Sequence, residues 1–272
     1  MPAATAGLGL GRRRAVLGAA GGCTLLVGAG PGAVHAGAPA AELVRNATSG
    51  TVHATVAAAV AAAAPGDELQ VPAGVHAERL LLDRAVTVAG PADGPPATVR
   101  HATDAAYEPT VVVQAGVEGV RLENLAVRHR SPSVASNYAV QVSEGAALEL
   151  VGCDVSSETG SGVGVEAGQL RASGTAFHDA AMNGICVYGD LAGAEGSGLA
   201  VLAGGCRVEG NGLNGILARG GARVEAEGCR VAGNAGKGAA FADATGTFRN
   251  CRWEGNRLGA VAAELGAEVE RL

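Results

Sequence analysis

The chain repeats a pattern of short, alternating apolar stretches that are separated by glycine or asparagine. One marker of the pattern is a tetrad. Its first residue is Gly or Asn, its second is Cys or a similar residue, its third varies, and its fourth is Val, Phe or Trp. The tetrads occupy residues 124–127, 152–155, 174–177, 205–208, 228–231 and 250–253. A second apolar tract follows each tetrad. The tracts recur at nearly the same spacing as the tetrads, about 22 residues, and both spacings are longer in the same repeats. Two markers that share one period indicate a structural repeat.

Each repeat is too short to bury an apolar face by itself, so neighbouring repeats must stack into a solenoid. A leucine-rich repeat would place Leu at a fixed set of positions, whereas the inward positions here mix Val, Ile, Ala and Cys. The pattern therefore predicts an all-β fold, a right-handed parallel β-helix with about 22 residues and three short strands per coil.

Composition agrees with a thin, layered architecture. The 272 residues include 44 Gly but only 3 Phe, 3 Tyr and 1 Trp, so small aliphatic side chains must fill the core. A hydrophobic content of 48% excludes a disordered chain. The net charge of −6, with no basic block after the N-terminus, argues against a nucleic-acid partner. After the N-terminal segment, no stretch approaches about 18 strongly apolar residues, so we expect no membrane span.

The first 36 residues predict a targeting segment. Three arginines at 12–14 precede a mildly apolar run rich in Gly and Ala, which ends in small residues near position 36. This order resembles a twin-arginine export signal and implies a periplasmic or extracellular protein. A transit peptide to an organellar lumen has similar features, and a cytoplasmic chain with a disordered tail is the alternative. We expect residues 1–36 to be removed, 37–50 to be a linker and 51–272 to be the β-helix domain.

Residues 51–64 and the strands after them resemble the N-terminal cap of the pectin-lyase-like β-helix superfamily. An amphipathic segment is followed at 65–75 by Pro-Gly-Asp, alternating apolar residues and Pro-Ala-Gly. The Asn-Gly-Ile runs at 183–185 and 214–216 are similar to the parallel β-helix repeats of the right-handed β-helix domain family. The resemblance implies a capping helix over 51–64. The repeated Gly-Cys-x-Val and Gly-Ile-x-Val pattern also resembles the β-helix of F-box-type substrate receptors. No F-box helices are predicted before it.

Cysteines occupy a repeated coil position. Four share the second position of the tetrad, namely Cys153, Cys206, Cys229 and Cys251. Strands of successive coils lie about 4.8 Å apart, so we expect an inward ladder of thiols that fills the core. Stacked thiols do not offer the tetrahedral geometry of a zinc site, although a disulfide between neighbours fits the spacing. Cys186 lies between two inward residues and should face outward.

Two further rows follow the repeat. Asn211, Asn234 and Asn256 each follow Gly at the same turn, which predicts hydrogen bonds between stacked amides. Just before the tetrads, an outward row of alternating charge is expected. Its members are Arg121, Glu149, Arg171, Leu202, Glu225 and Thr247.

The best catalytic candidates are Asp154, His178 and Asp179, which we expect near one corner of adjacent coils. A His beside a carboxylate can act as a general base. A solvated turn is the alternative interpretation, since the sequence shows no burial that would activate the group.

Repeated arginines are candidate ligand-binding residues, because guanidinium groups bind carboxylates and sulfates through paired hydrogen bonds. These residues are Arg207, Arg230 and Arg252 in one outward row, and Arg128 and Arg130 in the longer coil at 128–137. A second insertion lies at 189–198. Insertions of this kind commonly shape the binding face of a solenoid. Alternatively, the arginines pair with nearby glutamates.

The absence of a clustered carboxylate triplet and of paired aspartates on adjacent coils favours a non-catalytic scaffold without cofactors, which recognises a polysaccharide or a protein. The alternative is a carbohydrate-active enzyme, that is, a polyuronate lyase, an epimerase or a glycoside hydrolase. The segment 264–272 alternates like one more strand, and Leu217, Ala240 and Val261 predict an apolar strip beside it. We therefore expect self-association or partner docking at this end.

Overall fold

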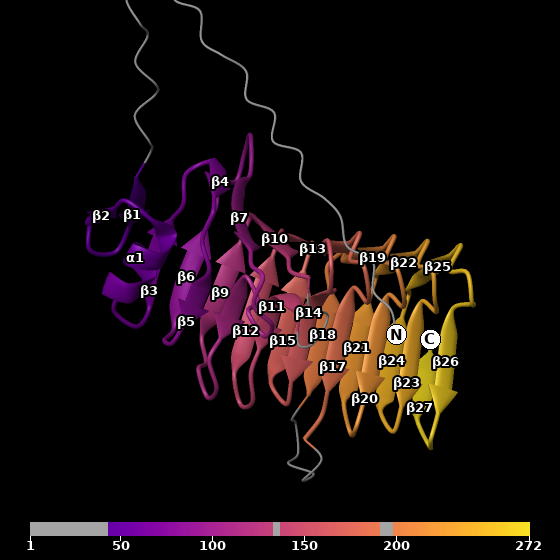
Figure 1. Cartoon of the computed structure of the whole chain (residues 1–272). Helices are drawn as coiled ribbons and strands as arrows, with labels where there is room; N and C mark the ends of the chain where they lie inside the picture. The colour runs from indigo at the N-terminus through magenta and orange to yellow at the C-terminus, as the bar shows by residue number, and fades with distance from the viewer. Residues whose placement is uncertain (1–42, 133–136, 191–197) are drawn as a thin grey trace, which may run out of the picture. The chain divides into compact units, whose positions relative to one another are not determined.

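Successive coils of the chain stack so that their strands line up into three sheets (Figure 1). The computed structural model describes residues 43–132, 137–190 and 198–272. The predicted targeting segment 1–36, the first part of the linker and most of the insertion at 189–198 lie outside these residues. Within the described residues the strands of all three sheets are parallel, except at the N-terminal end, which confirms the predicted parallel β-helix.

The first sheet contains eleven strands, and the other two contain eight each, among the described residues. In spatial order, the first sheet is β2 (Val52–His53), β1 (Val44–Asn46), β3 (Asp67–Gln70), β6 (Val86–Ala89), β9 (Val120–Glu123), β12 (Ala147–Val151), β15 (Gln169–Ser173), β18 (Leu199–Ala203), β21 (Arg223–Glu227), β24 (Thr245–Arg249) and β27 (Glu268–Arg271).

The second sheet is β4 (Gly74–His76), β7 (Ala97–Ala102), β10 (Leu125–Arg130), β13 (Asp154–Ser157), β16 (Ala176–His178), β19 (Arg207–Glu209), β22 (Arg230–Ala232) and β25 (Arg252–Glu254). The third sheet is β5 (Leu80–Leu82), β8 (Val111–Val113), β11 (Tyr138–Val142), β14 (Ser161–Glu166), β17 (Ile185–Tyr188), β20 (Ile216–Arg219), β23 (Ala239–Ala242) and β26 (Val261–Glu264).

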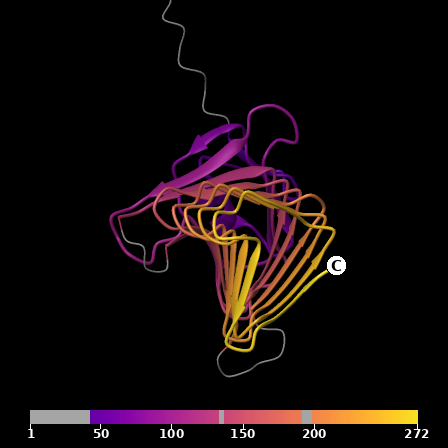
Figure 2. The same ribbon diagram turned by 90° about the vertical axis from the view of Figure 1, so that its right-hand side faces the viewer.

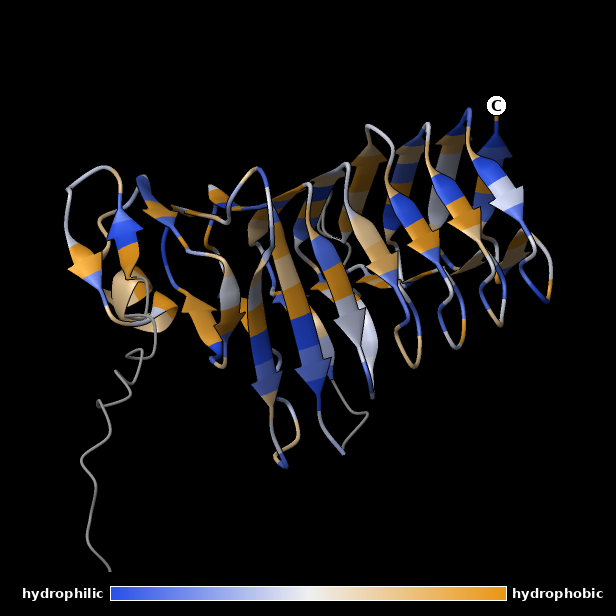
Figure 3. Cartoon of the chain, turned by 90° about the horizontal axis from the view of Figure 1, so that it is seen from above, coloured by the Kyte–Doolittle hydropathy of each residue, from blue (hydrophilic) through white to orange (hydrophobic). Residues whose placement is uncertain are grey.

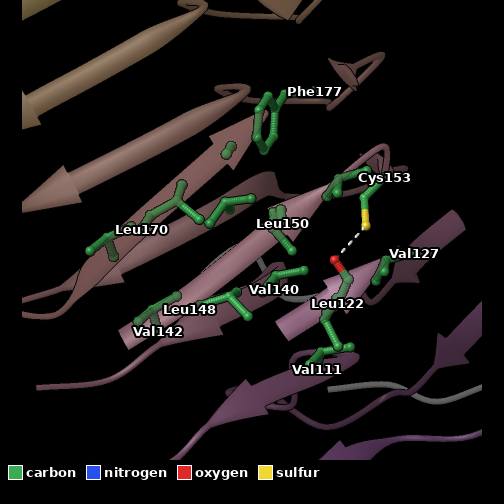
Figure 4. Close-up of a cluster of buried hydrophobic side chains, with 14 of the residues drawn as sticks. Val111, Leu122, Val127, Val140, Val142, Leu148, Leu150, Cys153, Leu170 and Phe177 are labelled. Carbon is green, nitrogen blue, oxygen red and sulfur yellow. Dashed lines mark hydrogen bonds between the residues drawn. The ribbon is translucent and has the colours of Figure 1, made fainter. Parts of the chain in front are cut away.

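The alternation of apolar and polar residues along each strand creates the interior. Alternate side chains point to opposite faces of a strand, so one face of every sheet packs inward and the other meets solvent (Figures 2 and 3). Figure 4 shows the result, with Leu150 and Leu170 of the first sheet beside Val140 of the third. Stacked aliphatic rows fill this narrow core, and the chain's few Phe side chains, including Phe177, are buried in it.

A single residue in the left-handed conformation makes the bend between the first and second sheets in most coils. The φ angle is +52° at Asn124, +60° at Gly152 and +63° at Gly228. Only Gly, and less readily Asn, adopts this conformation at little cost, which explains the first position of the tetrad.

One coil bends through two such residues, Gly204 and Gly205, with φ of +59° and +81°. The extra residue moves the inward and outward positions of the preceding strand by one place. Leu202, which the sequence spacing placed outward, is therefore buried in the core beside Ala226, and Val201 takes its outward place. The prediction for Leu202 was wrong.

The N-terminal end carries a shorter helix than expected. Helix α1 (Val56–Ala62) begins after Thr55, whose hydroxyl accepts a hydrogen bond from the Ala58 amide, and it buries an apolar face against the core. The carboxylate of Glu78 accepts hydrogen bonds from the first two helical amides, at 3.0 and 2.7 Å. Val52 and His53, near the start of the predicted helix, instead form strand β2, which pairs antiparallel with β1, a strand that lies in the predicted linker.

The predicted asparagine ladder is confirmed. Asn211 Nδ2 donates to Asn234 Oδ1, and Asn234 Nδ2 donates to Asn256 Oδ1, both at 2.8 Å. The same oxygens also accept from the backbone amides of the preceding rung. Each amide group thereby satisfies buried polar atoms at the turn between the second and third sheets.

The cysteines follow the prediction with two differences. Cys153, Cys206 and Cys229 are buried, and Figure 4 shows the Cys153 thiol donating to the Leu122 carbonyl at 3.4 Å. Cys251 was expected to be buried, but it is only half-buried. Cys186 lies on the outer side of the third sheet, as its position predicts, yet it is buried because other side chains cover it.

The last coil consists of β25, β26 and β27. Its apolar side chains Trp253, Val261 and Val269 pack against the core but remain partly exposed. The predicted outward position of Val261 was wrong, because Val261 pairs with the inward Ala239, and Ala262 continues the row of Leu217 and Ala240. Among the described residues, no helix is both long and apolar enough to cross a membrane.

We predict that Asn234→Ala lowers the free energy of unfolding by about 2–3 kcal/mol, because it leaves a buried backbone amide and a buried carbonyl without partners. Asn256→Ala, on the less buried last rung, should cost less. Chemical unfolding monitored by circular dichroism measures both. Equal losses in the two variants would contradict a role for burial in the ladder.

Candidate functional site

The structure brings Asp154, His178 and Asp179 together on the outer face of the second sheet. His178 Nε2 lies 2.8 Å from Asp154 Oδ1, and its Nδ1 lies 2.8 Å from Asp179 Oδ2. Both ring nitrogens of one imidazole are therefore hydrogen-bonded to carboxylates.

Arg128 completes this group from the opposite side of Asp154. Its guanidinium forms an ion pair with Asp154 Oδ1, and Nη1 donates to the Asp154 carbonyl at 2.8 Å and to the Val127 carbonyl at 3.1 Å. Sequence reasoning placed Arg128 in a ligand-binding loop, whereas the residue lies in strand β10. Its guanidinium group positions the carboxylate beside His178. We name Arg128, Asp154, His178 and Asp179 the histidine cluster.

The register of three adjacent strands builds this cluster. Asp154 pairs with Ala126 on one side and with Ala176 on the other. Arg128 and His178 lie two residues beyond those partners, so their side chains emerge on the same face and approach Asp154 diagonally. Asp179 has a φ of +49° and follows directly at the turn.

Charge and burial set the protonation states of the cluster. The hydrogen bond to Asp154, with a smaller contribution from Asp179, raises the pKa of His178 to about 8. Burial alone would raise the pKa of Asp154, but the hydrogen bond from His178 and the charge of Arg128 outweigh it and hold the pKa below its ordinary value. At neutral pH the cluster is thus an imidazolium between two carboxylates.

An open groove of about 520 Å³ begins at this imidazole and crosses the next three coils. Its charged lining residues are His178, Asp179, Glu209, Arg230 and Glu254. Arg230 forms ion pairs with Glu209 and, at 3.0 Å, with Glu254, while Arg207 lies 3.3 Å from Glu209. The groove therefore offers charges of both signs within a few ångströms.

The other arginines differ in their surroundings. Arg252 has no ion pair among the residues that the structure describes, and it is exposed next to the groove in register with Arg230. Arg130 lies 3.6 Å from Glu158 on the surface, away from the groove lining. The structure thus groups Arg230, Arg207 and Arg252 near the histidine cluster and leaves Arg130 apart.

Sequence reasoning missed a pocket of about 480 Å³ on the outer face of the third sheet. Two of the chain's three tyrosines, Tyr138 and Tyr188, line it together with Ser161 and Cys186. The Tyr138 ring lies directly on Gly164, where any β-carbon would overlap the ring. Burial raises the pKa of Tyr188 to about 12. The scarcity of aromatic residues, combined with two tyrosines on neighbouring outward strands, was the signal available in the sequence.

A metal centre is not evident in residues 43–132, 137–190 and 198–272, where no three His, Cys, Asp or Glu side chains converge in a way that could hold an ion.

Comparisons with known proteins identify the fold. The family model described as "Right handed beta helix region" matches residues 191–270. The pectin methylesterase from Aspergillus niger in deglycosylated form is similar to this chain, with 16% identity, a TM-score of 0.51 and 86% of each chain covered. A rhamnogalacturonan lyase is similar with 12% identity and a TM-score of 0.54, over 80% of this chain and 70% of that one. The curated proteins compared by sequence give no match.

These likenesses show the architecture alone. The chain has a right-handed parallel β-helix, as the sequence predicted. The similarity to the β-helix of F-box-type receptors stays a prediction.

We predict that Asp154→Asn lowers the pKa of His178 from about 8 toward 6.5, because the strongest partner of the imidazolium is lost. Asp179→Asn should lower it less, since the Asp179 side chain is 76% exposed. Titration of the ring protons by nuclear magnetic resonance measures both values.

The raised pKa of His178 also makes the stability of the protein depend on pH, in a direction that the shift determines. The His178 contribution is fully present below about pH 6.5 and is lost as the pH rises through 8. Thermal unfolding of the wild type should therefore lose more stability between pH 6.5 and 9 than that of His178→Gln. Parallel curves for the two proteins would show that the imidazolium contributes nothing.

Proposed function

We propose that this protein is a carbohydrate-active enzyme that abstracts a proton from uronic acid units of a polysaccharide, with His178 as the base. The sequence favoured a non-catalytic scaffold, but the neighbours named above are a pectin methylesterase and a rhamnogalacturonan lyase. They support the enzymatic alternative. The observation that carries the proposal is the His178 imidazole, held by two carboxylates at the head of a groove that Arg230 lines.

The geometry favours proton abstraction over glycoside hydrolysis. A glycosidase needs two carboxyl groups that flank the glycosidic bond and act separately as acid and as base or nucleophile. Asp154 and Asp179 instead both hydrogen-bond to the same imidazole. They therefore tune and orient one proton-transfer group, as carboxylates do for catalytic histidines.

The partners of the two ring nitrogens of His178 differ, and this difference indicates which nitrogen acts as the base. Asp154 is tied to Arg128 and to His178 Nε2, so Nε2 retains its proton. Asp179 is largely exposed and free to rotate, which releases Nδ1 toward the groove. Neutral His178 then removes the proton on the carbon next to a uronate carboxylate through Nδ1.

The electrons of that C–H bond have two fates. In a lyase they form a carbon–carbon double bond as the adjacent C–O glycosidic bond breaks, and the leaving oxygen takes a proton from water. In an epimerase they accept a proton on the opposite face. Both reactions share the abstraction step, in which charge builds on the substrate carboxylate.

The arginines fit that charge. Arg230 lines the groove and Arg252 extends its row to the next coil without an ion pair among the described residues. Coils repeat about every 4.8 Å, close to the length of one sugar unit in an extended chain. A polyuronate along the helix axis would thereby present one carboxylate per coil to bidentate guanidinium groups.

An exported location agrees with this proposal, because large polysaccharides are met outside the cytoplasm. The order of charged, apolar and small residues in 1–36 supports export through a twin-arginine-like signal. The segment lies outside the described residues.

We predict that purified protein releases unsaturated, ultraviolet-absorbing oligosaccharides from polygalacturonate or alginate, and that His178→Gln lowers kcat/KM by about 100-fold or more. Because the base must be neutral, the rate should rise with pH through about 8. Arg252→Gln should mainly raise KM. Arg130→Gln, remote from the groove, is the matched control and should leave both constants unchanged.

Two results would decide against this function. Full activity in His178→Gln would remove His178 from the mechanism. Binding of a polyuronate that Arg252→Gln weakens, with neither unsaturated product nor epimerised uronate, would return the protein to a recognition scaffold.

We also propose that the last coil mediates self-association. The edge strands β25, β26 and β27 have unpaired backbone groups on one side, and Trp253, Val261 and Val269 are only partly covered. Static light scattering at high micromolar concentration should show a species larger than a monomer, which Val261→Lys reduces. A strictly monomeric protein, unchanged by that substitution, would contradict this prediction.

A further inference from the structure

Three thiols stack on consecutive coils at the bend between the first and second sheets. The Arg230 amide donates to the Cys206 carbonyl, and the Arg252 amide donates to the Cys229 carbonyl, each at 2.9 Å. These bonds keep Cys206, Cys229 and Cys251 in register, one strand spacing of about 4.8 Å apart. Each thiol also lies 3.2–3.5 Å from a backbone carbonyl of its bend or of the preceding coil.

Cys229 occupies the centre of this thiol ladder. The register of β19, β22 and β25 places it between Cys206 on one side and Cys251 on the other, one coil away from each. Cys153 lies at the equivalent bend of an earlier coil, but the residue stacked on it is Thr175, whose hydroxyl accepts from the Cys153 amide at 3.3 Å. Among the described residues, only the last three coils therefore place one thiol next to another.

The three thiols differ in access to solvent. Cys206 and Cys229 are fully enclosed, with 0% and 1% of their surfaces exposed, whereas Cys251 is partly exposed. The hydrogen bond from Cys229 lowers the pKa of Cys251, which favours its thiolate. The neighbouring thiols of Cys206 and, next, of Cys251 raise the pKa of Cys229. An accessible nucleophile thus lies directly above a buried thiol.

We propose that Cys251 is a thiol–disulfide exchange site for small or protein-borne disulfides, with Cys229 as its resolving partner. The Cys251 thiolate attacks one sulfur of an incoming disulfide, which forms a mixed disulfide and releases one thiolate. Cys229 then attacks the Cys251 sulfur, which forms the internal disulfide and releases the second thiolate. The protons lost by the two cysteines pass to the released thiolates, and the incoming disulfide is reduced by two electrons.

The ladder limits which bonds can form. A disulfide requires α-carbons within about 7 Å, which one coil spacing satisfies. Cys206 and Cys251 are two coil spacings apart, about 9–10 Å, so they cannot pair directly. One internal disulfide forms at a time, and it always includes Cys229. In a further exchange, Cys206 can attack the Cys229 sulfur of this disulfide, which forms a Cys206–Cys229 disulfide and releases the Cys251 thiolate.

The test uses the full chain with Cys23→Ser, since Cys23 lies outside the described residues. The protein is incubated with oxidised glutathione, the remaining thiols are alkylated under denaturing conditions, and the bonded cysteines are mapped by mass spectrometry. We expect loss of two alkylatable thiols and a Cys229–Cys251 peptide pair. Cys229→Ser should stop at glutathione bound to Cys251.

Two variants complete the test. Cys251→Ser should abolish rapid oxidation of the native protein, because the remaining pair is buried. Cys153→Ser is the matched control, a buried bend cysteine without a thiol neighbour, and should oxidise like the parent. Circular dichroism checks that each variant is folded.

Two outcomes would overturn the inference: unchanged oxidation in Cys251→Ser, or a stable glutathione adduct on Cys251 in the parent that Cys229 never displaces.

Discussion

The in-register stacking of coils is the constraint on which every other feature depends. Among the described residues each coil hydrogen-bonds to its neighbours, and in most coils a single left-handed residue fixes where the strand of the second sheet starts. Side chains at equivalent positions are thereby brought within one strand spacing of each other. Aliphatic rows then close the core, amide rows satisfy the turn, and charged rows meet on the outer face. The solenoid converts a period in sequence into rows in space.

This conversion explains how much of the structure the sequence predicts. The period, the inward rows and the asparagine ladder follow from spacing alone, because each recurs at equivalent positions on successive coils. Departures from the period cannot be predicted from spacing, because one additional residue at a bend exchanges the inward and outward positions of the strand before it. At Gly204 and Gly205 it turned Leu202 inward. The capping helix was predicted, but its start was placed too early, because the pairing of β1 with β2 overrides the helical pattern at Val52 and His53.

The candidate site shows the same division. The spacing of Asp154 and His178 sufficed to place them together, because they share a corner of adjacent coils. The role of Arg128 was not visible, since it depends on the diagonal approach of side chains that lie two residues out of register. Cys186 was correctly placed on the outer side, but its burial depends on tyrosine side chains packed over the strand. Spacing predicts which residues are neighbours, and side-chain packing decides what covers them.

Register also separates the two chemistries of the last coils. The thiols lie at the bend and point into the core, while Arg207, Arg230 and Arg252 directly follow them on the strand and point outward. Every change in the alignment of these coils therefore moves both rows together. A disulfide at the bend fixes the spacing of its two coils, and with it the spacing of the guanidinium groups along the groove. Because side chains alternate between faces, the proposed disulfide inside the solenoid would be coupled to the proposed binding groove outside it through one residue of backbone.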